Sequence, residues 1–274
     1  MTTRAAPTVA FMGPAGTFSH IATRAAFPDH PTLETPTIAA VIDRVEQGAA
    51  EFGVIPIENS TEGGVSATLD ALMQGSVHIS GELVIDVPLC LVARHADRSR
   101  FRRVLSHPQP LAQCRRWLAR ELPVAVLVST SSTTVAAAEA ARDDEVAAVT
   151  SHLAAELHQL LVVAENIQDR AENATRFVIV GKTDAKQTGR DKTSLMFSTP
   201  HERGALRRAL GVFDDAGINL TRIESRPRAE KRWEYVFFAD LEGHREDPPV
   251  AHALERLAEL CGVVRVFGSY PRAG

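Results

Sequence analysis

Short apolar runs alternate with amphipathic stretches over the first two thirds of the chain, which predicts strands separated by helices. We expect strands at residues 8–12, 52–57, 103–106, 125–128, 146–149, 161–164 and 176–181, and a long extended segment at 76–93. We expect helices at residues 19–26, 38–47, 65–73, 111–121, 133–141 and 151–159. This order favours βαβ units and a mostly parallel sheet.

The last third of the chain has a different rhythm. Residues 183–192 read TDAKQTGRDK, are polar and contain no bulky apolar side chain, so they predict a linker. The elements expected after it are strands at 193–198, 218–225, 233–241 and 263–268, with helices at 203–215 and 249–260. Their order, βαββαβ, is typical of a ferredoxin-like sandwich. The sequence therefore predicts an α/β chain with a large first domain at 7–184 and a small second domain at 192–274.

Composition and charge narrow the classes of protein. Apolar residues make up 45% of the chain and charged residues 23%, which excludes a disordered chain. The net charge of −4 argues against a nucleic-acid partner. We find neither a signal-peptide pattern nor an apolar run of about 20 residues, so we expect no membrane partner and a cytoplasmic location. The cysteines are few, odd in number and widely spaced, which argues against a disulfide scaffold and a cysteine metal site.

Polar loops follow several of the expected strands, where open α/β sheets bind ligands. These loops occupy residues 13–20, 56–64, 106–110, 129–134 and 166–177. Each has a local alternative: Ser19 as a helix cap, Ser60 or Thr61 starting the next helix, His107 as a surface or structural residue, a helix N-cap within 129–134, and Arg176 starting an edge strand. Together the loops predict one cleft rich in neutral hydroxyls and amides, with an arginine and no metal-ligand spacing. Such a cleft suits an anionic small molecule, either for binding alone or for chemistry without a cofactor.

Four motifs in this order make the sequence resemble the prephenate dehydratase family. They are GPAGTFSH at 13–20, IPIENSTEGGV at 55–65, SHPQPLAQC at 106–114 and NIQDRAENATRF at 166–177. The C-terminal part resembles an ACT domain of the phenylalanine-sensing type, because Gly204-Ala205-Leu206 opens its first helix and Glu224-Ser225-Arg226-Pro227 ends its second strand. No helical chorismate mutase segment precedes the first motif, so the resemblance is to the monofunctional form.

The resemblance implies a fold and an activity. The first domain would have two lobes, like a periplasmic binding protein, at about 8–84 plus 176–181 and at 85–170, with the site between them. The enzyme would be a carbon-oxygen lyase that converts prephenate to phenylpyruvate with loss of water and CO2, with no cofactor or metal. L-Phenylalanine would be its allosteric effector, bound at ACT domains that pair in a homodimer or a dimer of dimers.

The resemblance also assigns residues. Thr175 would be the catalytic residue, donating a hydrogen bond toward the leaving hydroxyl, and Arg176 would pair with the substrate's side-chain carboxylate. The remaining substrate-binding residues would be Phe177, Asn59, Ser60, Thr61, Ser106, Gln109, Ser129, Thr130, Asn166 and Asn173. The effector-binding residues would be Gly204, Ala205, Leu206, Asn219, Glu224, Ser225, Arg226 and Pro227.

Two rival functions share these motifs. One is an arogenate dehydratase, which has the same fold and prefers the amino-acid analogue of prephenate. The other is a non-catalytic protein that binds or senses amino acids, since both folds occur in such proteins. The Thr175-Arg176-Phe177 motif together with the 59–61 loop favours catalysis. The hydroxyl-rich stretch at 129–134 departs from the family's usual Ser-Thr pair and leaves open which hydroxyl faces the ligand.

Overall fold

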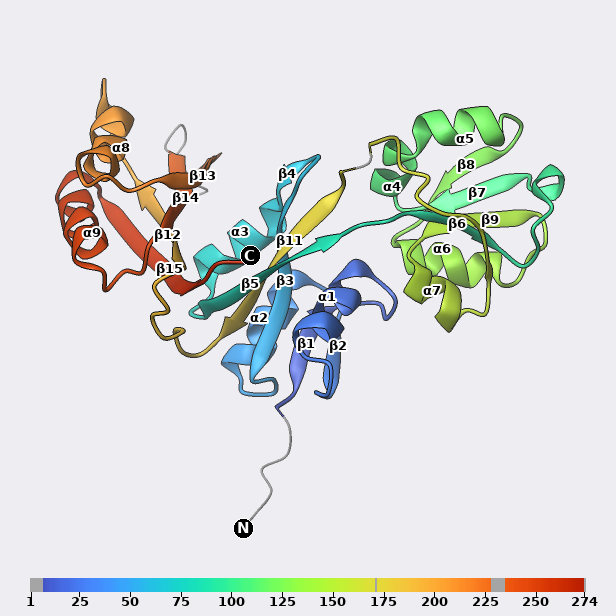
Figure 1. The fold of residues 1–274 in the computed structure, drawn as a ribbon, viewed down its shortest axis with the longest axis horizontal. Helices are drawn as coiled ribbons and strands as arrows, with labels where there is room; N and C mark the ends of the chain where they lie inside the picture. The colour runs from blue at the N-terminus through green and yellow to red at the C-terminus, as the bar shows by residue number, and fades with distance from the viewer. Residues whose placement is uncertain (1–6, 171, 228–234, 274) are drawn as a thin grey trace, which may run out of the picture. The chain divides into compact units, whose positions relative to one another are not determined.

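The structure is a computed structural model that describes residues 7–170, 172–227 and 235–273 (Figure 1). Its first sheet has the strand order β2-β1-β3-β11-β5, and β4 pairs with β3. The strands are β1 Val9–Met12, β2 Thr32–Thr35, β3 Phe52–Asn59, β4 Gly63–Gly64, β5 His78–Asp86 and β11 Ala174–Gly181. The helices that alternate with them in the sequence are α1 Phe18–Ala26, α2 Ile38–Glu46 and α3 Ser66–Gln74.

The second sheet has the order β10-β6-β9-β7-β8. Its strands are β6 Cys90–Ala93, β7 Arg103–Ser106, β8 Val126–Ser129, β9 Val146–Thr150 and β10 Leu161–Ala164. Its helices are α4 Pro108–Gln113, α5 Arg115–Glu121, α6 Thr133–Ala140 and α7 His152–Leu157, and the 3-10 helix η1 spans Arg98–Arg100. Strand β7 pairs parallel with β8 and β9, whereas β6 pairs antiparallel with β9 and β10. The prediction of a mostly parallel sheet is therefore wrong for this mixed sheet.

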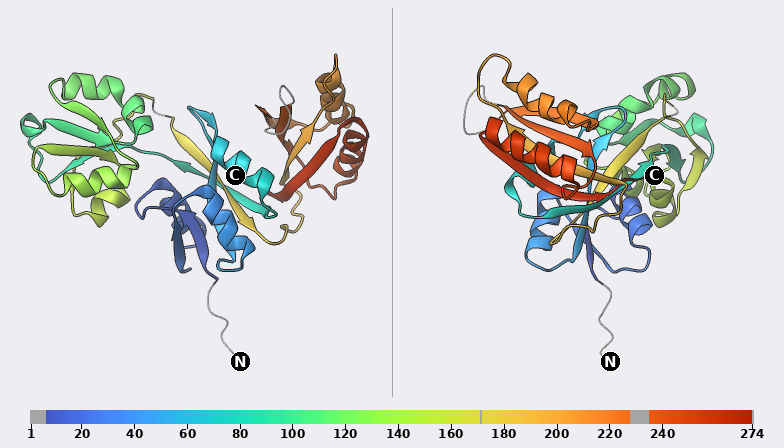
Figure 2. Two further views of the ribbon diagram at one scale, coloured as in Figure 1. Left: turned by 180° about the vertical axis from the view of Figure 1, so that it is seen from behind. Right: turned by 60° about the vertical axis from the view of Figure 1, so that its left-hand side comes forward.

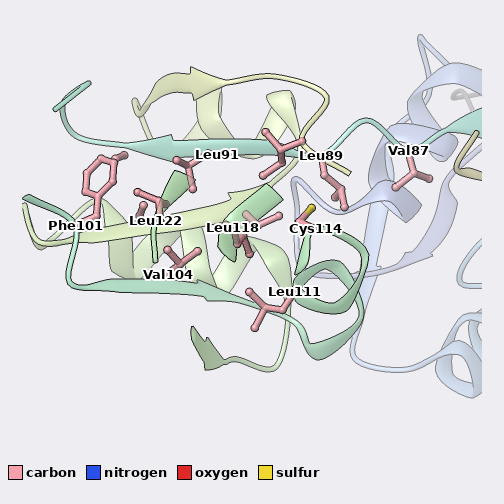
Figure 3. Close-up of a cluster of buried hydrophobic side chains, with 13 residues drawn as sticks. Val87, Leu89, Leu91, Phe101, Val104, Leu111, Cys114, Leu118 and Leu122 are labelled. Atoms are coloured by element: carbon pink, nitrogen blue, oxygen red, sulfur yellow. The ribbon is translucent and has the colours of Figure 1, made fainter. Parts of the chain in front are cut away.

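Helices cover both faces of the second sheet, and this explains why its central strands are continuously apolar (Figure 1). Alternate residues of one strand enter different cores: Leu91 packs in one cluster, and its neighbour Val92 packs in the other. The first cluster receives α4 and α5 through Leu111, Cys114 and Leu118 (Figure 3). The second receives the alanines of α6 and α7.

The third sheet has the order β13-β14-β12-β15, and the pairs β12–β14, β12–β15 and β13–β14 are antiparallel. Its strands are β12 Asp191–Ser198, β13 Leu220–Pro227, β14 Tyr235–Glu242 and β15 Val263–Pro271. Helices α8 Ala205–Asp215 and α9 Pro248–Leu260 cover one face, with Phe213 and Leu257 packed on Phe197 and Leu241 in one core (Figure 2). This is the predicted βαββαβ sandwich, and the predicted α/β fold class is confirmed.

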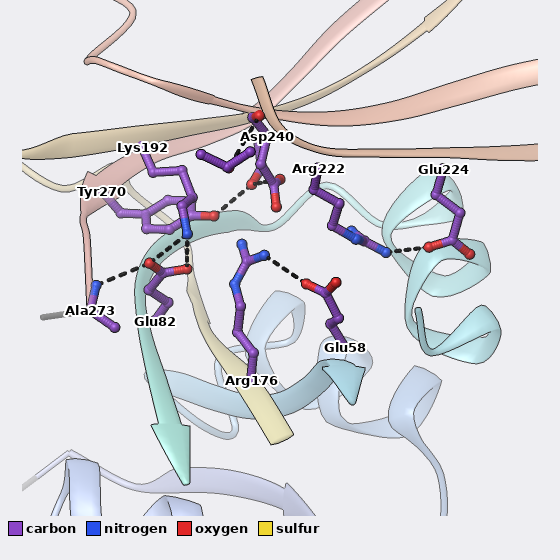
Figure 4. Close-up of polar contacts among 11 residues, drawn as sticks. Glu58, Glu82, Arg176, Lys192, Arg222, Glu224, Asp240, Tyr270 and Ala273 are labelled. Carbon is purple, nitrogen blue, oxygen red and sulfur yellow. Dashed lines mark hydrogen bonds and ion pairs between the residues drawn. The ribbon is translucent and has the colours of Figure 1, made fainter. Parts of the chain in front are cut away.

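Packing divides the chain into two compact units. The first comprises Met1–Val41, Val54–Val65 and Val84–Phe177, and the second comprises Ile42–Gly53, Ser66–Leu83 and Val178–Gly274. Within the second unit, Lys192 of β12 forms an ion pair with Glu82 of β5 at 2.8 Å, with side chains 12% and 2% exposed (Figure 4). The same carboxylate accepts the backbone N–H of Ala273 at 3.0 Å. These contacts hold β5 and the C-terminal strands in one body.

Several element boundaries differ from the prediction. The extended segment at 76–93 is two strands of different sheets, β5 and β6, because the chain leaves the first sheet after Asp86 and passes Pro88. The helix expected at 111–121 is divided at Cys114 into α4 and α5. Strand β2 was missed because it is short and largely exposed. The predicted linker ends early, since Asp191 already begins β12, and the expected strand position Trp233 lies outside the described residues.

Candidate functional site

The first unit contains a cavity of about 680 Å³ at the ends of β3 and β11. Of the predicted substrate and catalytic residues, Thr175, Asn59, Gln109 and Phe177 line it. Further polar residues in its wall are Thr17, Ser19, Glu34, Thr35, His107, Gln113, Ser131, Ser132 and Thr133. The described lining residues include one carboxylate and no lysine or arginine. The predicted cleft of neutral hydroxyls and amides therefore matches this cavity, except for the arginine.

Hydrogen bonds fix the orientation of the Asn59 side-chain amide. Its Oδ1 accepts the backbone N–H groups of Thr61 at 2.9 Å and Glu62 at 3.3 Å, and only an oxygen can accept there. Its Nδ2 lies 3.2 Å from the Ala174 carbonyl oxygen, which only accepts. The same Nδ2 donates to Thr175 Oγ1 at 3.0 Å. These contacts hold the loop after β3 against the start of β11 and account for the burial of Asn59.

The direction of this last hydrogen bond decides what Thr175 can do. Because Thr175 Oγ1 accepts from Asn59, its own O–H proton points to a different acceptor. Thr175 lines the cavity and is half-buried, so its hydroxyl is placed to donate to a group bound there. The arrangement can therefore supply a hydrogen-bond donor whose direction is fixed by Asn59.

A chain of amides continues from Asn59 through Asn173 to Gln113. Asn173 Oδ1 accepts from Asn59 Nδ2 at 3.2 Å and from Thr61 Oγ1 at 3.3 Å. Asn173 Nδ2 donates to the Val87 carbonyl at 3.3 Å and to Gln113 Oε1 at 3.1 Å. Asn173 and Thr61, both predicted to bind substrate, thus support Asn59 and do not line the cavity. These hydrogen bonds hold the loop after β3, the residue before β11 and the end of α4 together.

The loop after β1 forms another wall of the cavity. Glu34 of β2 accepts the backbone N–H of Ala15 at 2.9 Å, and an added Cβ at Gly13 would force the Glu34 side chain to move. Thr17 caps α1 by accepting the His20 N–H, which corrects the expectation that Ser19 would be the cap. Burial and the nearby Arg24 lower the pKa of His20, whose Nδ1 accepts the Gly16 N–H at 3.1 Å.

Two helices begin at the cavity. The first turn of α1 contributes Phe18 and Ser19, and the first turn of α6 contributes Thr133. Helix N-termini carry partial positive charge and favour anions, so these turns can hold carboxylates without a cationic side chain. In the hydroxyl-rich stretch, Ser131, Ser132 and Thr133 line the cavity, whereas the predicted residues Ser129 and Thr130 do not.

The other predicted substrate-binding residues lie outside the cavity lining. Arg176 is bound to Glu58 on neighbouring β3 at 3.3 Å (Figure 4). Ser106 is fully buried and donates to the Val149 carbonyl at 2.6 Å. Ser60 is exposed and donates to the Glu172 carbonyl at 3.5 Å. Asn166 is exposed, with φ of 51°. Neither Ser60 nor Thr61 begins the next helix, because α3 starts at Ser66, within one residue of the expected 65–73.

The cavity wall includes Gln113 and Glu34, which lie outside the polar loops that the sequence pattern indicated. Gln113 lies four residues after Gln109 in the SHPQPLAQC motif, and this spacing places both side chains on the same face of α4. That periodicity could have identified it. Glu34 lies on a strand that the sequence did not predict, so no local signal indicated its contact with the loop at residues 13–16.

The predicted effector residues separate into two groups. Gly204, Ala205 and Leu206 line a hollow of about 240 Å³ at the start of α8, together with Tyr235 and Phe237 of β14. Asn219 precedes β13 and the segment at 224–227 ends it, and neither is in the hollow's lining. Strand β13 is at the edge of the third sheet.

No group of three or more His, Cys, Asp and Glu side chains in the described ranges could hold a metal ion. In the same part of the chain, no helix is long and apolar enough to cross a membrane.

Comparison with known proteins places the chain in a family. The Prephenate dehydratase family model matches residues 9–185, and the ACT domain model matches 193–259. A bifunctional chorismate mutase/prephenate dehydratase of Aquifex aeolicus is 45% identical over 97% of this chain and 74% of its own length. The prephenate dehydratase of Amycolatopsis methanolica is 37% identical over 97% of this chain and 88% of its own length.

Two solved structures are similar to this chain over nearly its whole length. The prephenate dehydratase of Arthrobacter aurescens, solved in complex with L-Phe, has a TM-score of 0.90 and 37% identity, covering 97% of this chain and 90% of that one. A second structure, described as GqqA, a novel type of quorum quenching acylase, has a TM-score of 0.87 and 33% identity, covering 97% and 98%. The chain described here belongs to the prephenate dehydratase family and carries an ACT domain in its C-terminal part.

Proposed function

We propose that this protein converts prephenate to phenylpyruvate with loss of water and CO2, using Thr175 as the hydrogen-bond donor to the leaving hydroxyl. The observation that carries the proposal is the 3.0 Å hydrogen bond from Asn59 to Thr175 Oγ1 in the wall of the cavity. Membership of the prephenate dehydratase family supports the reaction.

The reaction suits a cavity without a cofactor. The bond between the ring and its carboxylate breaks, and its electron pair enters the ring while CO2 leaves. The C–O bond breaks at the opposite end of the ring, and the departing hydroxyl takes up one proton from solvent and leaves as water. Aromatisation supplies the driving force, so the protein has to hold the dianion and stabilise the charge that develops on the leaving oxygen.

Neutral groups of the cavity wall can do both. The first turns of α1 and α6 would bind carboxylate, and the side-chain amides of Gln109 and Gln113 would donate to it. The buried Phe177 ring and Val87 provide an apolar surface for the substrate ring. A threonine hydroxyl is too weak an acid to give up its proton completely at neutral pH, so Thr175 acts by a fixed hydrogen bond that strengthens as the C–O bond breaks.

Arg176 takes a different function from the one predicted. Its guanidinium is bound to Glu58, and Arg176 is outside the cavity lining. We assign Arg176 a positioning function. Its ion pair with Glu58 joins β11 to β3, and these two residues are the sequence neighbours of Thr175 and Asn59. Ser131, Ser132 and Thr133 line the cavity and would contact the substrate, whereas Ser129, Thr130 and Asn166 lie outside its lining.

We also propose that L-phenylalanine inhibits the enzyme by binding at the ACT domain. The hollow beside Gly204 has an aromatic wall of Tyr235 and Phe237, which suits an aromatic side chain. The related structure from Arthrobacter aurescens is a complex with L-Phe. Apolar side chains remain exposed near this sheet edge, with Ile223 48% and Tyr235 42% exposed, which supports pairing of ACT domains in a homodimer or dimer of dimers.

A direct contact connects the predicted effector segment to the catalytic part of the chain. Arg226 Nη2 binds both carboxylate oxygens of Asp70 on α3 at 2.8 Å, and its Nη1 donates to Ser66 Oγ at 2.9 Å. Arg265 of β15 donates to the Met73 carbonyl at 3.1 Å at the other end of α3. Helix α3 directly follows the loop of Asn59, so a shift of β13 on binding phenylalanine would be transmitted toward Thr175.

The domain limits proposed for this function are 7–184 for the catalytic domain, with lobes at about 8–84 plus 176–181 and at 85–170, and 192–274 for the ACT domain. The matched ranges of the two family models, 9–185 and 193–259, support these limits. As an enzyme of amino-acid biosynthesis, the protein would act in the cytoplasm.

The test is turnover of prephenate and of arogenate by the purified chain, following the release of phenylpyruvate, phenylalanine and CO2. We expect stoichiometric CO2 and phenylpyruvate from prephenate, and a lower rate when phenylalanine is added. Preferential turnover of arogenate would establish the rival dehydratase. Binding of either compound without release of CO2 would contradict the proposal and leave a non-catalytic sensor.

A further inference from the structure

A second hollow of about 340 Å³ lies in the first unit, beside the cavity that contains Thr175. Three arginines line it: Arg115 and Arg116 from the first turn of α5, and Arg170 from the segment before β11. All three side chains belong to exposed residues. Arg170 belongs to the motif at 166–177, but the mechanism proposed above uses none of these three guanidinium groups.

The charge of this hollow is positive. Asp169 is the one acidic residue among the described lining residues, and both of its oxygens already accept backbone N–H groups. Its Oδ2 accepts from Arg116 N at 2.9 Å, and its Oδ1 accepts from Trp117 N at 3.1 Å. These hydrogen bonds hold the Asp169 carboxylate at the start of α5. The partial positive charge of the helix N-terminus partly compensates its negative charge there.

The hollow and the cavity share a wall. Gln113 lines both of them. Thr61 and Asn173 line the hollow, and both are bonded into the amide chain that ends at Asn59. The hollow and the cavity therefore meet at Gln113, whose Oε1 accepts from Asn173 Nδ2 at 3.1 Å.

The hollow and the cavity differ in charge, and this difference affects the approach of a dianionic substrate. The cavity around Thr175 is lined, in the part of the chain described, by Glu34 and by no lysine or arginine. A dicarboxylate approaching it meets no attractive cation in that wall. The arginines next to it supply the missing positive field, and guanidinium groups bind carboxylates with two parallel hydrogen bonds.

We propose that the hollow of Arg115, Arg116 and Arg170 is an outer anion-binding site that captures dicarboxylates before they reach the cavity across Gln113. The expected effect on kcat/KM rests on the proposed function, since it assumes that the reacting molecule is a dianion. The expected binding of anions does not rest on it, because the arginines would hold any small dicarboxylate that fits.

The binding test uses malonate as the probe, titrated by calorimetry at low salt. The variant is R115Q/R116Q/R170Q, and the matched control is R120Q. Arg120 is an exposed arginine of the same helix that is paired with Glu121 at 2.8 Å and is absent from the hollow's lining. We expect the wild type and R120Q to bind malonate alike, and the triple variant to bind at least tenfold more weakly. Equal binding by all three, or no binding by the wild type, overturns the proposal.

The kinetic test measures kcat/KM for prephenate as a function of ionic strength. We expect the triple variant to lose about tenfold or more in kcat/KM at low salt, with a difference from wild type that shrinks as salt rises. An unchanged kcat/KM and an unchanged salt dependence would contradict capture by these arginines. If the wild type does not turn over prephenate at all, the proposed function fails, and the malonate titration still decides whether the hollow binds anions.

Discussion

Replacement of Asn59 by aspartate should reverse the hydrogen bond on which the proposed mechanism depends. In the wild type, Asn59 Nδ2 donates to Thr175 Oγ1 at 3.0 Å, which leaves the threonine proton for the substrate. An aspartate of the same shape has no N–H to donate. The Thr175 hydroxyl would then donate to the new carboxylate and turn its proton away from the cavity.

The magnitude follows from the loss of one oriented donor in the transition state. Removal of such a donor costs about 2.7–4 kcal/mol, so kcat of N59D should fall by about 10²- to 10³-fold. The carboxylate would also face the Ala174 carbonyl and Asn173 Oδ1, each 3.2 Å from Asn59 Nδ2 in the wild type. The new carboxylate oxygen and these two carbonyl oxygens would be three acceptors with no proton between them. Their repulsion should lower the free energy of unfolding by about 1–3 kcal/mol.

The assay is steady-state turnover of prephenate, with N166D as the matched control because Asn166 is exposed and outside the cavity lining. We expect N166D to keep the wild-type kcat. Acidification should partly restore N59D relative to wild type, because a protonated carboxyl again carries a donor. If N59D keeps kcat within about threefold of wild type while folded, as judged by thermal unfolding, the argument from Asn59 to Thr175 is refuted.

The remaining predictions concern regulation and stability. D70A removes the carboxylate that holds Arg226, so we expect a phenylalanine concentration for half-inhibition at least about tenfold higher, and an unchanged inhibition curve would exclude this contact from the coupling. S225L places a bulky side chain in the predicted effector segment and should abolish inhibition, measured as the ratio of rates with and without phenylalanine; a normal ratio would remove Ser225 from the site. Burial would raise the pKa of Asp191, but hydrogen bonds from Thr188 and Gly189 outweigh it and lower the pKa, so this carboxylate stabilises the fold above about pH 4 and its contribution is lost as pH falls through its folded-state pKa. D191N should therefore lower the melting temperature at pH 7 and flatten its decline in acid, and a parallel decline in both proteins would contradict this assignment.

Much of the fold could be predicted because the local patterns agree with the tertiary packing. Strand β9 is apolar at nearly every position and is buried at every position between two layers of helices. Helix α8 begins after Gly204 with φ of 78°, and the apolar face of that helix packs on the third sheet. The mixed pairing of β6 was not predictable in the same way, because an apolar strand reads the same in either direction.

The candidate site was predictable only as a set of loops. The sequence identified the segments that carry Asn59, Gln109 and Thr175, and these side chains do line one cavity. It could not distinguish a side chain that enters the cavity from its neighbour that turns away, since successive residues of β11 point to opposite faces. Thus Thr175 lines the cavity while Arg176 pairs with Glu58. The hydroxyls at 129–134 follow no such alternation, because Ser131, Ser132 and Thr133 are successive residues at the start of α6 and all line the cavity.

The most direct test of the central claim compares T175V with T175S. Valine keeps the shape of threonine and lacks the hydroxyl, whereas serine keeps the hydroxyl that accepts from Asn59. The account predicts that T175V loses about 10²-fold or more in kcat for prephenate and that T175S retains most of it. A T175V enzyme with wild-type kcat and only a raised KM would contradict it.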